Sequence, residues 1–397
     1  MRVYTRWVDL LAIYRAELLE RVMPFWIDHA IDWEYGGIST CIADDGTIIS
    51  QDKYLWSQLR AIWTFAALYN RIDRRPLWLD VARHIYQFVR RCGRDEAGRW
   101  AFAVDRHGRV IEGATSIFTD GFAIYGLTEL ARATGEQEAI DLALETYRRV
   151  RDRLAHPGSY GIAPYEMPTN AKAHAVAMIF ALVFYELGRF LDDREIMEAG
   201  LAQARDVMDV FLRPDDGLVR EYVALDGSLI DAPQGRVVVP GHAIESMWFM
   251  VHIFRREGDE RRVLRAIEAI RRHLEFGWDA EYGGLFHARD AAGGQASWRF
   301  AEAKLWWPHT EALYALLLAY EVSRQAWCLE WFERVHDYAF SHFPVPRHGE
   351  WIQRLDREGR PLQDVVALPV KDPFHLPRSL ILSIQLLERS AHTLEAR

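Results

Sequence analysis

The feature that most constrains this chain is a pattern that recurs six times along it. Each copy has an amphipathic helix, a short β excursion with glycine turns, and a second, more apolar helix. We predict that the second helices open near residues 53, 118, 171, 242, 307 and 377. In the first copy, the alternating residues 38–42 and the turn at 44–46 predict a β-hairpin. The third copy, with a helix over 136–154, lacks the hairpin.

The second helices are apolar around their whole circumference, as residues 178–185 and 312–320 illustrate. Helices of this kind belong in a protein interior. Six of them inside six amphipathic helices predict an all-α fold, an (α/α)6 barrel, that occupies residues 1–397 as a single domain. A doubly wound α/β sheet fits less well, because its strands would be longer apolar runs that alternate with single helices.

The net charge of −9 argues against a nucleic-acid partner or an anionic membrane surface, since both require a dominant basic patch. Residues 1–30 contain no uninterrupted apolar stretch, and no later segment reaches about 18 apolar residues without a charge. The three cysteines have unrelated spacings and suggest neither disulfides nor a zinc site. We therefore expect a soluble cytoplasmic protein without a membrane segment. Its 15 tryptophans supply flat rings suited to the apolar faces of sugars.

One of the predicted inner helices begins with an unusual polar pair. Pro240-Gly241 breaks the preceding segment, and apolar residues then recur at helical spacing from Ile244 onward. His242 falls in the first turn, where the helix dipole favours a neutral imidazole, and Glu245 lies on the same side. A histidine and a carboxylate are thus expected to point together from the helix mouth. The alternative is a capping box with a surface histidine.

In an (α/α)6 barrel the six inner helices begin at one end, so the polar residues near these starts converge there. Pro377 suits the first position of the last helix, which places His375 just outside its first turn. Individually the residues have structural explanations, such as an ion pair between Arg60 and Glu311. Together they predict a binding pocket. The candidates are Trp56, Arg60, Asn170, His174, His242, Glu245, Lys304, Trp307, Glu311, His375 and Arg378.

The residue types of this cluster favour proton transfer. The sequence has no metalloprotease, nucleophilic-serine, phosphate-loop or dinucleotide-binding motif, and we predict neither a metal ion nor a cofactor. One histidine can remove a proton beside a carbonyl and another can return it, while Arg60 stabilises the enolate oxygen. On a sugar, this chemistry is C2 epimerisation or aldose–ketose isomerisation.

The chain resembles the N-acylglucosamine 2-epimerase superfamily from end to end. The resemblance rests on six motifs: Asp32-Trp-Glu-Tyr-Gly-Gly37, Lys53-Tyr-Leu-Trp56 with Gln58 and Arg60, Pro240-Gly-His-Ala-Ile-Glu245 with Trp248, Gly277-Trp-Asp-Ala-Glu-Tyr-Gly-Gly284, Lys304-Leu-Trp-Trp-Pro-His-Thr-Glu311 and Phe374-His-Leu-Pro-Arg378. It implies an (α/α)6 barrel and an enzyme that moves a proton at C2 of a reducing sugar. It further implies that Arg60 is the essential arginine, His242 and His375 are the acid/base pair, and Glu245 and Glu311 are the helix carboxylates.

Different motifs of this sequence resemble family members that act on different sugars. The runs that contain Glu245 and Glu311 are most similar to the N-acetylglucosamine enzymes, so N-acetylglucosamine and N-acetylmannosamine are the first-choice pair. Asn170 and His174 resemble instead the site of cellobiose 2-epimerases and mannose isomerases, although Ala177 stands where those relatives usually carry glutamate. Glucose/mannose epimerisation and mannose/fructose isomerisation are therefore the alternatives.

Two readings from other functional classes remain open. (α/α)6 barrels also host glycoside hydrolases, which need two carboxyls about 5 to 9.5 Å apart. The carboxyls available for that role are those of Asp120, Glu245, Glu311 and Asp372. A sugar-binding or protein-binding module without catalysis is the other reading. A homodimer is expected from base rates for soluble proteins, but no stretch identifies its interface.

Overall fold

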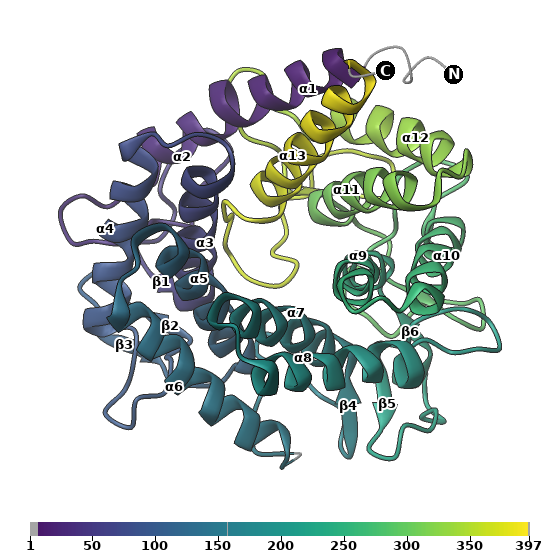
Figure 1. The fold of residues 1–397 in the computed structure, drawn as a ribbon, viewed down its shortest axis with the longest axis horizontal. Coiled ribbons are helices and arrows are strands. Elements are labelled where there is room, and N and C mark those ends of the chain that lie inside the picture. The colour runs from purple at the N-terminus through teal and green to yellow at the C-terminus, as the bar shows by residue number, and fades with distance from the viewer. Residues whose placement is uncertain (1–6, 157, 396–397) are drawn as a thin grey trace.

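The computed structural model describes residues 7–156 and 158–395, and its helices form a double-walled ring (Figure 1). The predicted (α/α)6 barrel is confirmed. The inner wall consists of α3 (Leu55–Arg71), α5 (Ile117–Thr134), α7 (His174–Leu191), α9 (Pro240–Arg256), α11 (Trp306–Ser323) and α13 (His375–Glu395). The outer wall consists of α1 (Trp7–Ala16), η1 (Glu17–Val22) and α2 (Met23–His29) as one element, then α4 (Pro76–Cys92), α6 (Gln137–Leu154), α8 (Arg194–Asp206) with η2 (Val207–Phe211), α10 (Glu260–Gly277) and α12 (Trp327–His342).

Burial explains the difference between the two walls. In the outer helix α10, the buried positions include Val263, Ala266, Ile267 and Ile270, which repeat at i, i+3, i+4 and i+7 on one face. In the inner helix α11, by contrast, every residue from 307 to 319 is buried. An inner helix packs against outer helices on one side and inner neighbours on the other, so it has no face left for charged side chains except at its ends.

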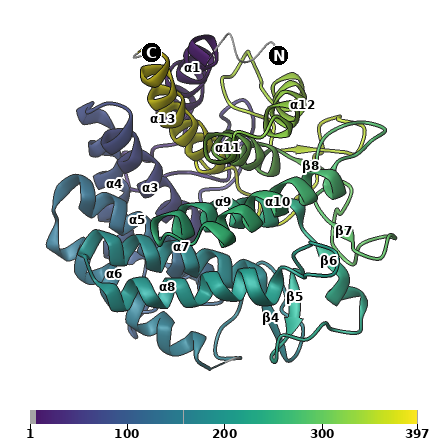
Figure 2. The same ribbon diagram turned by 45° about the vertical axis from the view of Figure 1, so that its right-hand side comes forward.

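Apart from the β2–β3 pair, the short strands pair between neighbouring units. They are β1 (Lys53–Tyr54), β2 (Ala103–Val104), β3 (Val110–Glu112), β4 (Ala171–Ala173), β5 (Tyr222–Ala224), β6 (Val237–Val238), β7 (Arg289–Asp290), β8 (Lys304–Leu305) and β9 (Arg354–Leu355), with the short helix η3 (Pro233–Arg236) before β6. The antiparallel pairs are β1–β2, β2–β3, β4–β5, β6–β7 and β8–β9. The strands β4 to β8 gather at one end of the helices (Figure 2).

The predicted hairpin over residues 32–46 is therefore only partly correct. A tight turn does close at Gly46, whose N–H donates to the carbonyl of Ala43. Beyond it, only isolated bridges form, between Ile31 and Ile38 and between Ile42 and Ile48. The extended pairing takes place between the residues just before one inner helix and the loop of the next unit, which ties adjacent units together.

Within the described residues, one helix is long and apolar enough to cross a membrane by composition, namely α7. Of this 18-residue helix, 78% is buried inside the barrel. Its hydrophobicity therefore follows from its position in the inner wall.

Candidate active site

A pocket opens at the end of the barrel where the inner helices begin. Seven of the predicted residues line it: Trp56, Arg60, His242, Glu245, Trp307, His375 and Arg378. Aromatic and aliphatic side chains from α5 and α7 complete its wall. Leu368, Val370 and Asp372 reach it from the loop between β9 and α13, and this loop extends toward the centre of the ring (Figure 1).

Arg60 is a buried cation with aromatic faces on several sides. Its guanidinium carbon lies 4.5 Å from the ring centre of Trp56, 4.1 Å from Phe122 and 4.7 Å from Phe374. Its Nη1 donates to Oδ2 of Asp372 at 3.1 Å, while its Nε is buried without a partner. The ion pair with Glu311 that the sequence allowed is replaced by this pair with Asp372. A planar cation held by ring stacking presents donors to the pocket in a fixed orientation.

His375 is backed by a carboxylate that has other partners. Its Nδ1 lies 2.8 Å from Oε1 of Glu311. Glu311 also accepts from Nη2 of Arg378 at 2.6 Å and from the indole N–H of Trp248 at 2.8 Å. Burial lowers the pKa of His375 well below its ordinary value, and the positive charges of Arg60 and Arg378 act in the same direction. His375 is therefore neutral at pH 7, with Nδ1–H bound to Glu311 and Nε2 free to accept a proton.

The last helix starts two residues earlier than expected. α13 begins at His375 itself, so that His375 is a helix residue and Pro377 lies within the first turn. The prediction that His375 precedes the helix was wrong, and the chain satisfies proline's preference for an early helix position two residues later than expected.

His242 is backed by Glu221, which the sequence did not indicate. Its Nδ1 lies 3.1 Å from Oε2 of Glu221. Burial acts to lower the pKa of His242, but the negative charge of Glu221 and the hydrogen bond to it outweigh burial, and the pKa is raised. The helix dipole therefore does not determine the pKa of His242 as predicted, because a full charge at hydrogen-bond distance is stronger than the partial charge of a helix end. The predicted capping box does not form either, since Val239 is the N-cap residue.

Trp307 brings the two histidines into one site. Its ring centre lies 5.1 Å from that of His242 and 5.4 Å from that of His375. Because each imidazole uses Nδ1 for its carboxylate, Nε2 of each is the nitrogen available to a molecule in the pocket. The indole is therefore a shared wall for both proton-transfer groups.

His174 is a buried neighbour of this group and is not among the residues that line the pocket. Its Nε2 lies 3.0 Å from Oγ of Ser246, whose hydroxyl donates to the carbonyl of Ala243. His174 must therefore be the donor to Ser246, and its Nδ1 has no hydrogen-bond partner. Burial lowers its pKa. A neutral His174 is consistent with both observations.

Asn170, a predicted pocket residue, does not lie in the helix that contains His174. It precedes β4 in a left-handed conformation with φ of 55°, and its side chain is exposed. The helix begins only at His174, because residues 171–173 pair with β5 instead. The structure does not bring Asn170 to the pocket.

Lys304 is also outside the pocket, contrary to its predicted contact with the substrate. Its Nζ is fully buried and donates to Oδ2 of Asp279 and to the carbonyl of Gly283, both at 2.9 Å. Arg357 donates to the same carboxylate oxygen at 3.0 Å. The lysine thus fixes β8 to the loop that begins at Asp279.

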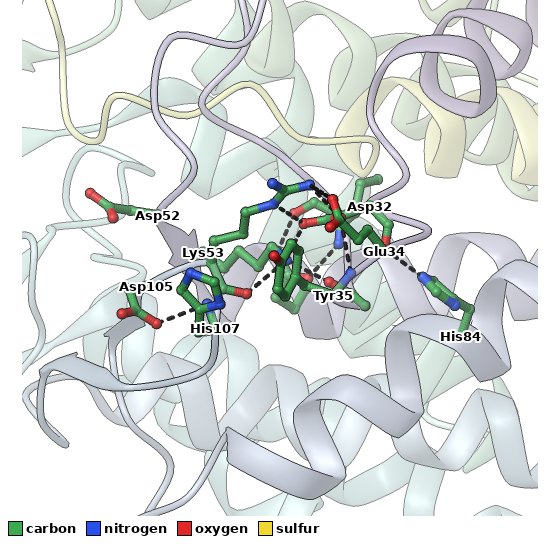
Figure 3. A network of polar contacts seen from close by, with 12 residues as sticks. Asp32, Glu34, Tyr35, Asp52, Lys53, His84, Asp105 and His107 are labelled. Atoms are coloured by element: carbon green, nitrogen blue, oxygen red, sulfur yellow. Dashed lines mark hydrogen bonds and ion pairs between the residues drawn. The ribbon is translucent and has the colours of Figure 1, made fainter.

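The first unit contains a copy of this clamp, which is drawn in Figure 3. Nζ of Lys53 donates to Oδ2 of Asp32 at 2.9 Å and to the carbonyl of Gly36. Arg106 donates to both oxygens of Asp32. His84 contacts the carbonyl of Asp32. In each clamp the third residue after the lysine is a tryptophan of the pocket, Trp56 or Trp307.

Glu245, Glu311 and His375 bring three potential ligand atoms within 4.8 Å of one another. The guanidinium of Arg378 already binds both carboxylates. A metal ion would have to displace the buried Arg378. The two carboxylates therefore fit the guanidinium of Arg378 better than a divalent metal ion.

Two further functional groups were missed as site partners, Glu221 for His242 and Asp372 for Arg60. Glu221 stands one residue before β5, and its backbone contacts both His174 and Val237. Nothing in its local sequence relates it to His242, which lies 21 residues later. The sequence suggested Asp372 only as a candidate carboxyl of a glycoside hydrolase. Its position shortly before His375 in the sequence could have indicated that it lies near the pocket.

The fold and this site together define a helical-toroid isomerase, in which two histidines and an arginine line one pocket. The chain belongs to the N-acylglucosamine 2-epimerase family, whose model matches residues 36–376. It is 32% identical to the N-acylglucosamine 2-epimerase of Mus musculus over 95% of this chain and 92% of that protein. It is 23% identical to the cellobiose 2-epimerase of Dictyoglomus turgidum, with 87% and 92% covered. The cellobiose 2-epimerase structure from Bacillus thermoamylovorans has a TM-score of 0.83 at 21% identity, with 96% and 99% covered.

Proposed function

We propose that the protein is a sugar 2-epimerase that interconverts N-acetylglucosamine and N-acetylmannosamine by moving the proton at C2. The observation that carries the proposal is the pair of carboxylate-backed histidines, His242 and His375, which contact the same indole beside Arg60. The choice of the N-acetyl sugars is supported by the 32% identity to the mouse protein of that name.

The proton balance of the reaction needs two groups and one cation. On the open-chain sugar, one histidine takes the C2 proton, the C–H electron pair forms the C1=C2 bond, and the carbonyl pair moves to O1. Arg60 is the cation available to stabilise this oxyanion, since it keeps its charge at every relevant pH. The second histidine then gives a proton to the other face of C2, and the carbonyl forms again.

Nuclear magnetic resonance in D2O tests this function. With N-acetylglucosamine or N-acetylmannosamine, deuterium should enter at C2 while the other epimer appears. Exchange only with glucose or mannose would change the substrate assignment. Formation of fructose from mannose would identify an aldose–ketose isomerase, in which the proton returns to C1. No exchange with any of these sugars would overturn the proposal.

The arrangement of carboxyls argues against a glycoside hydrolase. Glu245 and Glu311 bind the same guanidinium of Arg378, and Asp372 binds Arg60. Asp120 is paired with Arg153 and does not line the pocket. A hydrolase needs one carboxyl that stays protonated beside the leaving group, and each pocket carboxylate has a permanent cation instead.

We further propose a homodimer in the cytoplasm, on general base rates for soluble enzymes. Sedimentation velocity over a range of protein concentrations tests the association. A species of one chain at all concentrations would contradict it.

A further inference from the structure

The two histidine–carboxylate pairs differ in how the carboxylate charge is balanced. Glu221 is 3% exposed, and among the described residues its side chain has one hydrogen-bond partner, His242. The nearby Nδ1 of His174 is 3.8 Å away, beyond hydrogen-bond length, and His174 is the neutral donor to Ser246. A buried carboxylate requires a compensating positive charge. Of the two neighbouring imidazoles, His242 is the one placed to supply it.

Glu311 does not require a positive charge on His375. Its Oε1 already accepts from the permanent cation Arg378, and its Oε2 accepts from Trp248. His375 also faces the second cation, Arg60. The same pairing of histidine with glutamate therefore favours opposite protonation states in the two halves of the site.

We propose that Glu221 is a positioning residue that holds His242 protonated with Nε2 toward the pocket, so that the resting site has one proton donor, His242, and one acceptor, His375. The inference rests on the proposed function, because it assigns these two groups to the proton transfers at C2. It does not rest on which sugar carries that carbon.

The electrostatic surroundings of the two histidines support this division. Burial acts to lower the pKa of His242, Glu221 and Glu245 raise it, and Arg60 on α3 lowers it. The neighbouring His174 and His287 are also buried, and burial lowers the pKa of each, with the charge of His242 acting in the same direction. The facing charged groups on other elements are already paired: Arg378 on α13 with Glu311 on α11, and Arg60 with Asp372. Burial acts to raise the pKa of Glu221, but the pKa is lowered to about 2, with the charge of His242 as the largest opposing influence and the ring of His174 acting in the same direction.

The cycle that follows is balanced in protons. His375 takes the proton from C2 and becomes charged, and His242 gives its proton to the opposite face and becomes neutral. The site then holds one proton, as before, but on the other histidine. Exchange of both groups with solvent restores the resting state, so a deuterium from D2O is expected in each product molecule.

The protonation states are measured directly by nitrogen-15 NMR of histidine-labelled protein, with His242→Asn and His375→Asn used to assign the signals. At pH 7, we expect a charged imidazolium for His242 and a neutral ring with protonated Nδ1 for His375. In Glu221→Gln, His242 should become neutral while the His375 signals stay unchanged. This measurement needs no turnover, so it is independent of whether the sugar assignment is correct. A neutral His242 in the unaltered protein would overturn the inference.

The pH dependence of kcat/KM supplies the second test. The alkaline limb should report loss of the His242 proton, and Glu221→Gln should move that limb to lower pH and leave the acid limb in place. Each pH unit beyond the pKa removes about tenfold of the protonated form, so activity at pH 8 should fall about 10- to 100-fold, and the difference should narrow below pH 6. Glu311→Gln is the matched control and should not shift the alkaline limb. A uniform loss across pH in Glu221→Gln would indicate a structural role and contradict the inference.

Discussion

At the scale of single residues, the site shows how partners determine the chemistry of identical side chains. His242 and His375 each lie in the first turn of an inner helix, and each contacts a glutamate through Nδ1. Burial lowers the pKa of His375, and the charges of Arg60 and Arg378 act in the same direction. The pKa of His242 is raised because the charge of Glu221, which no arginine contacts among the described residues, outweighs burial. Position on a helix is a weaker determinant than the next charge in space.

The first prediction concerns these two histidines. His242→Asn and His375→Asn should each reduce turnover at least ~100-fold, the usual scale for losing a general acid or base. The far-ultraviolet circular dichroism should be unchanged. His156→Asn is the control, since His156 is exposed and lies outside the pocket. Near-normal turnover in either variant would mean that another group exchanges protons with C2.

The second prediction concerns Arg60. Arg60→Lys keeps the charge but loses the planar group that stacks on Trp56 and Phe122. We expect turnover to fall about 100- to 1,000-fold, as for loss of one oxyanion donor, with a smaller change in KM. Arg153→Lys, which alters a half-buried ion pair outside the pocket, should be near normal. Equal losses in both variants would indicate a general effect on folding.

The sequence could identify those site residues that sit on predicted helix starts, such as Arg60 and His242. It could not identify Glu221, because its contact with His242 depends on how β5 is placed between β4 and β6. It also assigned Lys304 to the substrate, because a lysine near a helix start looks functional until its buried partner Asp279 is known. Helical periodicity reports burial within one element, whereas such contacts arise between elements.

At the scale of elements, the two clamps hold the strands that lead into the pocket tryptophans. Asp279 binds the fully buried Lys304 and the half-buried Arg357, and Asp32 binds Lys53 and Arg106 in the same way. Each clamp joins the loop of one unit to the strand before the next inner helix. These two units of the repeat therefore share the polar clamp as well as their helices.

The third prediction tests the clamp at Asp279. Asp279→Ala leaves the charge of Lys304 buried without its partner, which typically costs about 3–5 kcal/mol. Urea unfolding should show that loss of stability. Glu281→Ala removes a largely exposed carboxylate that pairs with the same Arg357 and should cost at most about 1 kcal/mol. Similar losses from the two substitutions would mean that the buried lysine is not held by Asp279.

At the scale of the whole molecule, the ring must close between its first and last units. Two indole N–H groups and two carboxylates make that closure: Trp26 donates to Glu350, and Trp351 donates to Glu17. Burial raises the pKa of Glu350 to about 7, although Lys371 and the hydrogen bonds oppose the rise. The seam between the chain ends therefore contains a carboxyl that titrates near neutrality.

The fourth prediction follows from that titration. Between pH 4.5 and about 7, folded protein keeps the Glu350 proton that unfolded protein has lost, so the free energy of unfolding falls as pH rises. A pKa rise from 4.5 to about 7 corresponds to about 3 kcal/mol across this window. In Glu350→Gln this contribution should disappear, which urea unfolding at several pH values would detect. Glu358→Gln, at an exposed position, should keep the wild-type slope, and an unchanged slope in Glu350→Gln would refute the assignment.

The end of the barrel opposite the pocket is closed by ion pairs between the last turns of neighbouring inner helices. Arg71 of α3 pairs with Glu129 of α5, and Arg132 of α5 pairs with Glu186 of α7. The series continues from Glu186 to Arg256 of α9, and from Arg255 through Glu321 to Arg389 of α13. Arginine at a helix C-terminus also interacts favourably with the helix dipole. The pairs therefore join neighbouring inner helices far from the chemistry.

The last prediction is that these ion pairs affect stability and not activity. Glu129 is 3% exposed and binds Arg71 through two hydrogen bonds, so Glu129→Gln leaves the partly buried Arg71 without its counter-charge and should cost about 1–3 kcal/mol. Glu321→Gln affects arginines that are more than half exposed and should cost at most about 1 kcal/mol, a loss that added salt reduces further. Calorimetry would measure both, and kcat/KM at 25 °C should stay within about twofold of wild type, because neither glutamate lines the pocket. A large loss of kcat/KM in folded Glu129→Gln would show instead that the two ends of the inner helices are coupled.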